Sequence, residues 1–536
     1  MREHNRNKKK GKEQSSDNVQ CTYRDRFYSL RKGTLLKRWQ KYAYWTLPQY
    51  ILPDGHTKVE QPICRDYQEM GALLVNNLAS KLAGLLFPPG RAFFKAEPSA
   101  EMLHAAKKQG YVELDLQNQL AIAEVAASKA LYVNAAYAQI NTALKLLIIT
   151  GNALVFRDTE RQTIRVYSPQ NYVTIRAPDG TVVEVVLREQ MAFGSIDVEY
   201  QNKLRGMHAK YRNYQPDSDV WRFTRIVLEQ PVMDSGKARY VETQQLDDLQ
   251  VDYRKEYPID ICPWMAPMWN HISGEHYGRG LVEDFAGGFA KLSAMMESGT
   301  LYAVEIMKIL NLVAPQAMAD LEELNNAVPG QYVQGVPGQI APYMQGDARK
   351  LEDVRAVCQD TIQSLAKAFM FKGNTRDAER VTEYELRLDA AEAEQTLGGA
   401  YSTLAAALQL PMARVLFSEQ QKDFEVGVVL GHFTPRIVSG LQSLGRSADV
   451  QNLVAAAQEI AAIVPVLTQA DSRIDPQKVI DMIMMARSVD FQAIQKTQQQ
   501  IQEEQQAKAQ QLQGQQQIAQ AQAMSAQADQ LQALGQ

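Results

Sequence analysis

Cysteine and histidine are scarce in this chain of 536 residues, and neither type clusters. Among the seven histidines the closest pair, His271 and His276, stands beside an expected helix start, where capping or surface roles are commoner than metal binding. No CxxC pair or histidine at zinc-ligand spacing accompanies the cysteines, so a structural zinc site and a disulfide-stapled secreted fold are both unexpected. The four cysteines are Cys21, Cys64, Cys262 and Cys358.

A dominant charge and a long apolar run are lacking as well. The chain has 57 basic and 61 acidic side chains, a net charge of -4, which excludes a uniformly basic nucleic-acid coat but allows a local basic patch. The longest charge-free stretch that looks apolar, residues 395–413, contains two glycines and a proline, so we expect no membrane span. No apolar segment follows the basic N-terminus, so we expect no signal peptide and a reducing, aqueous compartment.

The motifs of catalytic sites are also missing. The sequence contains no GxxxxGKS or GxxxxGKT phosphate loop, no HExxH, no GxSxG elbow and no GxGxxG after a strand. Carboxylate pairs such as Glu283-Asp284 lie in helical contexts, where a solvated face is commoner than an acid/base dyad. A nuclease or an ATP-driven motor component would need such features, so we expect no enzyme, no cofactor and no metal site.

The composition that is present is that of a globular protein with several domains. Hydrophobic residues make up 45% of the chain and charged residues 22%, and the length suits roughly three or four domains. Residues 1–20 are polar and charge-rich, which predicts a disordered basic arm. Helical periodicity follows at about 70–86 and 112–149, and short β-branched and aromatic runs between about 153 and 241 predict a β-rich insertion. The expected fold class is therefore mainly α with a β-rich insertion (α+β).

Helical periodicity returns at about 281–310 and 351–369, on either side of an unusual connection. Residues 324–346 hold three prolines and four glycines but no charged side chain. Surface loops are normally solvated by charge, so a charge-free loop favours contact with another surface, with an ordinary buried connection as the alternative. The residues that we expect at this interface are Tyr332, Val333, Val336 and Tyr343.

A short basic cluster separates the second of these helices from the next one. Lys372, Arg376 and Arg380 crowd a breaker-rich segment in which acidic residues are interleaved. In an isolated monomer these are the charges of a solvated interhelical loop, whereas beside a polyanion they become phosphate contacts. Arg380 has a further alternative, an ion pair with Glu379 or Glu383.

The last segment is of low complexity. Between residues 491 and 536 there are 20 glutamines in 46 residues, with alanine next most common. Both types favour helix, but the larger apolar residues are too sparse for one such helix to be stable alone. The segment is therefore either disordered or one stave of a many-stranded assembly, and a filamentous or scaffolding protein built on it is the alternative function. That alternative leaves the β-rich insertion and the long ordered body unexplained.

Several short motifs without catalytic logic occur in a characteristic order and spacing over roughly residues 20–490. They are residues 76–82 (NNLASKL), 86–88 (LFP), 277–280 (YGRG), 379–382 (ERVT) followed by Glu385, 396–401 (TLGGAY) and 408–411 (LQLP). Together they resemble the portal, or head-to-tail connector, proteins of short-tailed phages of the self-transcribing podovirus group.

The resemblance implies a homo-oligomer, a ring of twelve subunits at one capsid vertex of the virion, assembled in the host bacterial cytoplasm. Double-stranded DNA passes through its axial channel during packaging and ejection, without sequence-specific contacts. The implied partners are the terminase packaging motor, the major capsid and scaffold proteins, a tail adaptor protein and internal core proteins. The slightly acidic balance agrees with such a channel, because strong phosphate neutralisation along the bore would arrest DNA movement.

The family architecture, carried over to this chain, consists of a wing, a stem, a clip, a crown and a C-terminal helical barrel. It places Lys372, Arg376 and Arg380 in a channel (tunnel) loop, residues 371–380. The other implied segments are the basic arm 1–20, the wing 21–275, the stem helices 276–310 and 348–370, the clip 311–347, the wing spine helix 381–417, the crown 418–490 and the Gln-rich barrel or tail 491–536.

Overall fold

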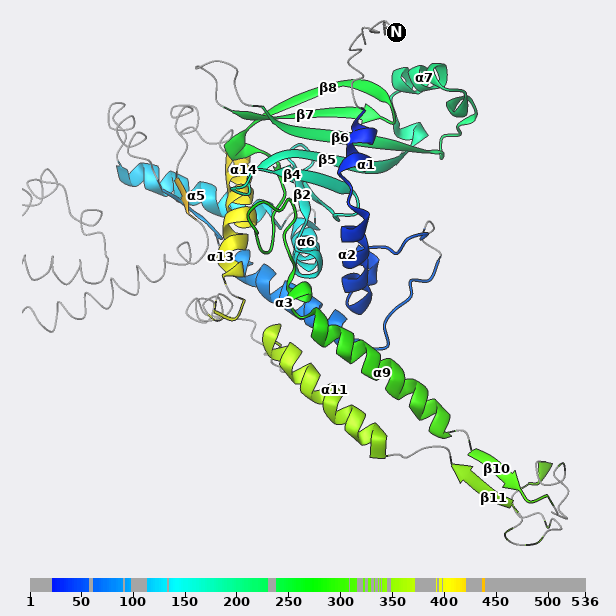
Figure 1. Ribbon diagram of the computed structural model, residues 1–536. Helices are drawn as coiled ribbons and strands as arrows, with labels where there is room; N and C mark the ends of the chain where they lie inside the picture. Colours follow the sequence, from blue (N-terminus) through cyan, green and yellow to red (C-terminus); the bar gives the residue numbers. More distant parts are fainter. Residues whose placement is uncertain are drawn as a thin grey trace, which may run out of the picture. The chain divides into compact units, whose positions relative to one another are not determined.

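The computed structural model describes several stretches of the chain, all within one compact unit of residues 1–443 (Figure 1). The second unit, residues 444–536, lies outside the described residues, as do the expected basic arm and the channel loop after Phe371. Described are residues 22–56, 61–89, 92–97, 113–132, 135–229, 238–307, 309–315, 340–344, 349–371, 399–420 and 436–438, with isolated positions within 322–338 and 392–397.

The N-terminal part is helical. Its main helices are α1 (Tyr23–Leu30), α2 (Gly33–Trp45), α3 (Met70–Leu86), α5 (Glu113–Ala130) and α6 (Ala136–Thr150). α3 packs against α6 with Leu78 and Leu82 completely buried, whereas Leu73 is 46% exposed. The helical region expected at 112–149 is two helices, because Ala135 adopts a left-handed backbone conformation directly before α6.

The β-rich part contains two antiparallel sheets, with strand orders β4-β5-β6-β7-β8 and β3-β2-β9. Its elements are β2 (Leu154–Asp158), β3 (Thr163–Tyr167), β4 (Tyr172–Arg176), β5 (Val182–Ala192), α7 (Val198–Met207), β6 (Asp219–Glu229), β7 (Arg239–Leu246), β8 (Leu249–Pro258) and β9 (Trp264–Met265). The insertion expected to end at about 241 thus continues to Met265. The prediction stopped too early because β8 is a largely exposed edge strand, and its polar and charged residues do not form the β-branched and aromatic runs that marked the other strands.

Helix α1 holds the N-terminal part of the described chain against the larger sheet. Phe27 is completely buried among Val173, Val186 and Phe223. Beside it, Arg26 donates two hydrogen bonds to Glu184 Oε2, at 3.2 Å from Nε and 2.7 Å from Nη2. One aromatic anchor and one charged contact therefore fix this short helix to the sheet.

Three glycines make the junction between α6, β2 and the chain that returns from β9. Gly151 ends α6 in a left-handed conformation with φ of 79°. A Cβ atom on Gly280 would lie 2.6 Å from the Ile148 carbonyl oxygen and 2.7 Å from the Gly151 nitrogen. Asn152 closes the crossing by donating to the Gly278 carbonyl and accepting from the Gly278 amide, both at 2.8 Å. Two backbone segments can come this close only because neither carries a side chain there.

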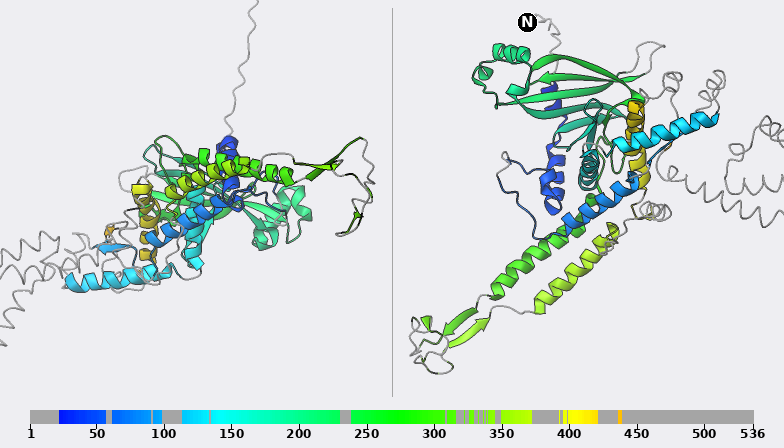
Figure 2. Two further views of the ribbon diagram at one scale, coloured as in Figure 1. Left: turned by 90° about the horizontal axis from the view of Figure 1, so that it is seen from below. Right: turned by 180° about the vertical axis from the view of Figure 1, so that it is seen from behind.

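The long pair of helices follows this junction. Its elements are α8 (Leu281–Asp284), α9 (Ala286–Met307), β10 (Ile309–Val313), β11 (Ile340–Met344) and α11 (Arg349–Ala368). α9 and α11 lie side by side in both views, with Phe289 against Phe369 and a ring-centroid distance of 5.7 Å (Figures 1 and 2). The helix expected over 276–310 begins only at Leu281, breaks at Phe285 and ends at Met307, because the β-branched residues that follow pair as an antiparallel ladder, β10 with β11.

A second helical column closes the described chain. α13 (Ala400–Leu404) runs through a π-helical turn, Ala405–Gln409, into α14 (Leu410–Gln420). Gly399, directly before α13, is left-handed with φ of 85°, and the π turn ends two residues before Pro411. A π turn shifts the hydrogen-bond register, which accommodates a residue without an amide hydrogen. A short ladder also joins β1 (Lys95–Glu97) to β12 (Arg436–Val438).

Candidate functional site

The residues predicted from the sequence to form sites fall on two segments. Lys372, Arg376 and Arg380 follow α11 in the sequence and lie outside the described residues. Val333 also lies outside them. Tyr332 and Val336 are described and are 99% and 53% exposed. Tyr343 stands opposite Leu310 in the β10–β11 ladder. The structure thus brings the described part of the charge-free segment to the end of the long helix pair, and it does not test the basic cluster.

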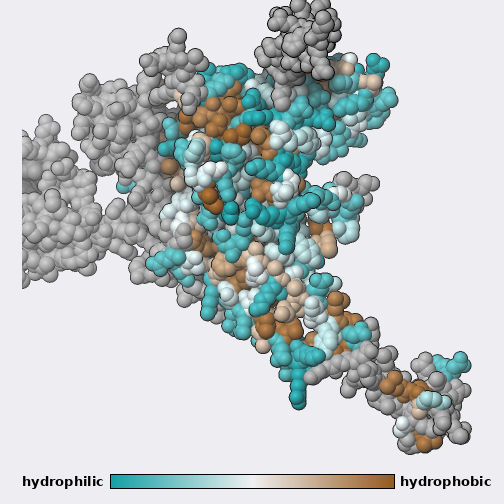
Figure 3. Space-filling model, viewed as in Figure 1, coloured by the Kyte–Doolittle hydropathy of each residue, from teal (hydrophilic) through white to brown (hydrophobic). Residues whose placement is uncertain are grey.

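An apolar surface runs along α9 and onto this hairpin. α9 has 22 residues, of which three are charged, yet only Phe289 and Leu292 are buried. In Figure 3, several brown, hydrophobic residues lie on the surface of the region that contains α9 and the hairpin. We name the exposed set the α9 apolar surface; its members are Leu301 (57% exposed), Val304 (54%), Met307 (78%) and Leu312 (56%). Exposed apolar patches of this kind on a charge-poor helix mark interaction surfaces.

Two of the sequence motifs that lie in the described residues are packing elements. Leu78, Ala79 and Leu82 of the first motif are completely buried in α3. Gln409 of the last motif donates through Nε2 to the carbonyl oxygens of Leu86 and Phe93, and so ties the π turn to the end of α3. Motifs that lack catalytic residue types are expected when they stabilise the fold, and the named residues of these two motifs serve packing and backbone contacts.

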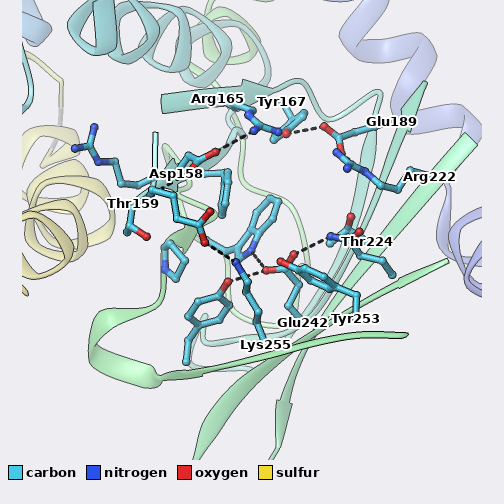
Figure 4. Close-up of a pocket in the computed structure, with 17 residues that line it drawn as sticks. Asp158, Thr159, Arg165, Tyr167, Glu189, Arg222, Thr224, Glu242, Tyr253 and Lys255 are labelled. Atoms are coloured by element: carbon cyan, nitrogen blue, oxygen red, sulfur yellow. Dashed lines mark hydrogen bonds and ion pairs between the residues drawn. The ribbon is translucent and has the colours of Figure 1, made fainter. Parts of the chain in front are cut away.

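A polar cavity of about 270 Å³ lies between the two sheets, lined by residues of β2, β3 and β5 to β9 (Figure 4). The ten side chains labelled in Figure 4 surround it. Its basic side chains are paired with carboxylates within hydrogen-bond distance. The pairs are Arg165 Nη2 with Asp158 (3.0 Å), Arg222 Nη2 with Glu189 (2.6 Å) and Lys255 Nζ with Glu160 (3.2 Å).

Glu242 is the most deeply buried carboxylate of the cavity, at 2% exposure. It accepts hydrogen bonds from Trp264 Nε1 at 2.9 Å, from the Tyr257 hydroxyl at 3.0 Å and from Gln244 Nε2 at 3.3 Å. No lysine or arginine in the described part of the chain forms an ion pair with it. Burial, and after it the Glu242 carboxylate, raises the pKa of Tyr257, and the same causes raise the pKa of Tyr253 to about 12. Both hydroxyls therefore stay protonated, as donors, throughout the physiological range.

Sequence reasoning missed this cavity because its lining comes from strands up to about a hundred residues apart. The only local signal is the density of aromatic and charged residues in β8, which is also what an exposed edge strand shows. Within the described stretches, no group of three histidine, cysteine, aspartate or glutamate side chains is placed to hold a metal ion. No helix in those stretches has the length and apolar character needed to cross a membrane.

Comparison with known proteins gives a family match over most of the chain. The family model described as bacteriophage head to tail connecting protein matches residues 21–494. The portal protein of Pseudomonas phage phiKMV is 37% identical over 475 residues, which cover 88% of this chain and 91% of that protein. The portal protein of Escherichia phage T7 is 28% identical over 475 residues, covering 87% of this chain and 86% of its own length.

Among solved structures, a chain in the neck of an empty GTA particle aligns with a TM-score of 0.33 and 11% sequence identity. The alignment covers 73% of this chain and 86% of that one. A chain of the virion of a native gene transfer agent particle aligns with a TM-score of 0.29 and 10% identity, over 77% and 93% of the two chains.

Proposed function

This chain belongs to the bacteriophage head-to-tail connecting proteins, and we propose that its copies form a closed ring of twelve around a channel for double-stranded DNA. It is a portal protein of the T7-like podoviruses, a structural and not an enzymatic component, located at the head-tail junction of the virion. The ring is the path of the genome during packaging and ejection, and the platform for the packaging motor and the tail.

The observation that carries the ring proposal is the α9 apolar surface. A helix that is apolar on most sides is normally buried, yet α9 leaves Leu301, Val304 and Met307 more than half exposed. In a closed head-to-tail ring, one surface of each subunit contacts a different surface of the next subunit. Every copy of the α9 apolar surface would therefore be covered by a neighbouring subunit. The neighbouring copy of this chain is therefore the partner that we assign to this surface.

α11 has the opposite character and suits the channel wall. Its buried residues are Cys358, Thr361 and Leu365, and all of its exposed residues except Ala356 are polar or charged. The charges of α11 are exposed and nearly balanced, four basic and three acidic: Arg349, Lys350, Arg355 and Lys367 against Glu352, Asp353 and Asp360. A wall with little net charge holds phosphates weakly, so a duplex can slide along it in both directions.

The basic cluster Lys372, Arg376 and Arg380 is proposed as the channel loop. It follows α11 directly in the sequence, and a ring repeats it around the bore as a girdle of positive charge. Each phosphate contact is weak and screened by salt, but many contacts together resist backward slippage of DNA without reading its sequence.

The remaining segments are proposed to follow the portal architecture. α9 and α11 form the stem, residues 311–347 the clip, residues 21–275 the wing, and residues 381–417 its spine. The β10–β11 tip, with Tyr332 almost fully exposed, is proposed to meet the neighbouring clip, the terminase motor and the tail adaptor. The crown and the Gln-rich barrel follow after residue 417, with capsid, scaffold and internal core proteins as further partners.

The ring proposal is tested by placing a charge on the α9 apolar surface. The variant Leu301→Asp should lose ring assembly, because its carboxylate would be buried without a partner at the subunit contact. Gln359→Asp adds the same charge on an exposed position of α11 and should assemble normally. Native mass spectrometry and negative-stain images count the subunits. Closed rings from Leu301→Asp would contradict the interface, and fibres from the wild-type protein would favour the filament alternative.

A further inference from the structure

We propose that the cavity between the two sheets is a binding site for a primary ammonium group on a short alkyl chain, held by Glu242 between aromatic side chains. This site lies in the β-rich part of the chain, away from α9 and α11. The site itself does not depend on the ring proposal, whereas a lysine of another copy as its ligand rests on that proposal. Its ligand is either a free small amine or the side chain of a lysine from another copy of this chain, and the experiment below separates the two.

The charge pattern of the cavity leaves one anionic group without a cation. Arg165, Arg222 and Lys255 each have a carboxylate partner at 3.2 Å or less. Among the described residues, Glu242, at 2% exposure, accepts hydrogen bonds from the neutral donors of Trp264, Tyr257 and Gln244 and forms no ion pair. Indole and amide N–H groups can only donate, so these contacts orient the carboxylate as an acceptor. A buried carboxylate is stabilised further by a cation. Lys255 stands opposite Glu242 in the β7–β8 ladder but pairs with Glu160, so a ligand can supply the cation.

The walls favour a cation over a neutral ligand. Phe156 and Trp264 stack with ring centroids 4.2 Å apart, and Tyr167 lies 6.2 Å from the Trp264 ring. Tyr253 and Tyr257 line the side formed by β8. Aromatic faces carry negative potential and attract cations. Arg165 and Lys255 already lie over the Phe156 and Tyr253 rings, 5.7 Å and 5.6 Å from the ring centroids, so these walls accept positive charge.

The size of the cavity limits the ligand. Its volume of about 270 Å³ is just below the range of about 300–1,000 Å³ that is usual for small-molecule sites. The space suits an amine with a chain of about four carbons. It is too small for a nucleotide, and the paired cations leave no free anion site.

Binding can be measured on the full-length protein with 1,4-diaminobutane as the probe, because Trp264 is a fluorescent reporter in contact with Glu242. We expect a saturable change in tryptophan fluorescence that is lost in Trp264→Phe and absent with 1,4-butanediol, which has the same length without charge. The variant Glu242→Gln keeps the shape and should weaken binding by at least about tenfold. Glu256→Gln removes an exposed carboxylate from the neighbouring strand β8 and should bind as the wild type does.

A second variant keeps the test decisive should Glu242→Gln fold poorly. Tyr253→Leu leaves the carboxylate in place, removes one aromatic wall and should weaken binding about threefold. The proposal is overturned if Glu242→Gln, correctly folded by circular dichroism, binds like the wild type. It is equally overturned if the diol binds as well as the diamine, or if neither rings nor dispersed subunits bind the diamine.

The source of the ammonium group follows from comparing dispersed subunits with assembled rings. Equal binding to both forms supports a free amine as the natural ligand, because the cavity then remains open after assembly. Binding to dispersed subunits alone supports a lysine of another copy, which fills the cavity on assembly and excludes the probe.

Discussion

The guanidinium of Arg157 and the carboxylate of Glu419 form a two-pronged ion pair across 262 residues of sequence, with Nε–Oε1 at 3.0 Å and Nη2–Oε2 at 2.9 Å. The Arg157 side chain is completely buried, and its Nη1 also donates to the Gln162 carbonyl at 2.8 Å. This pair ties β2 of the β-rich part to α14, the helix at the end of the proposed wing spine. The ion pair therefore joins the sheet that contains β2 directly to α14, which in the proposed ring leads away from the DNA channel.

Glu419→Gln should destabilise this link strongly. A buried arginine that loses its carboxylate remains as an uncompensated charge, which typically costs about 3–5 kcal/mol. We expect a lower thermal midpoint and early proteolytic cleavage near α14. Asp260→Asn removes the carboxylate of a second, exposed α14 pair with Arg414 and should have little effect. Equal midpoints for Glu419→Gln and the wild type would show that the pair is dispensable.

Gly280→Ala should destabilise the junction between α6 and the start of the stem. The new Cβ would lie 2.6 Å from the Ile148 carbonyl oxygen, so the backbone must shift, at a cost of about 1–3 kcal/mol. Gly287→Ala is the matched control, since a Cβ there meets nothing within 4 Å. A chemical unfolding curve of each variant measures the difference. A Gly280→Ala midpoint as high as that of Gly287→Ala would refute the close-packing argument.

Acid should loosen α1 from the sheet through Glu184. Burial opposes ionisation of this carboxyl, but hydrogen bonds from Arg26 and Arg225 outweigh burial and lower its pKa below the ordinary value of 4.5. Because the pKa is lower in the folded state, the stabilisation is complete above about pH 4.5 and is lost as the pH falls through the folded-state pKa.

Glu184→Gln should therefore be less stable than the wild type at pH 7, by about 1–2 kcal/mol, and should show a smaller loss of stability between pH 5 and pH 3. Thermal midpoints across that range test this. Glu229→Gln, which removes the carboxylate of an exposed pair with Arg254, should keep the wild-type pH dependence. Parallel curves for Glu184→Gln and the wild type would exclude this role of Glu184.

Lys372→Ala combined with Arg376→Ala should leave ring assembly normal and let filled heads lose DNA. The double change removes two positive charges per subunit from the proposed girdle, so the phosphate contacts that resist slippage weaken. DNA retention is measured by nuclease protection of filled heads, with rings counted separately. Lys203→Ala with Arg212→Ala removes the same charge from exposed positions of the β-rich part and should retain DNA. Full retention by the Lys372 and Arg376 variant would reduce these residues to solvated loop charges.

Local patterns were sufficient for two of the helices, α3 and α11, and for the family. The spacing of leucines in α3 and of apolar residues in α11 predicted both helices. A helix that packs on one side must repeat its apolar residues every three to four positions. The family prediction, drawn from motif order, is confirmed by the match over residues 21–494. The interpretation of residues 372–380 as a channel loop stays a prediction, since they lie outside the described residues.

The amino-acid sequence by itself therefore determined the order of the main helical and β-rich parts and the protein family. The hairpin beyond Met307, the extension of the sheets to Met265, the Arg157–Glu419 pair and the Glu242 cavity were decided only by the tertiary structure. The reason is physical. Periodicity records which face of an element avoids water, whereas a strand partner, a buried ion pair or a cavity depends on residues that the fold brings together from more than 25 to more than 250 positions away.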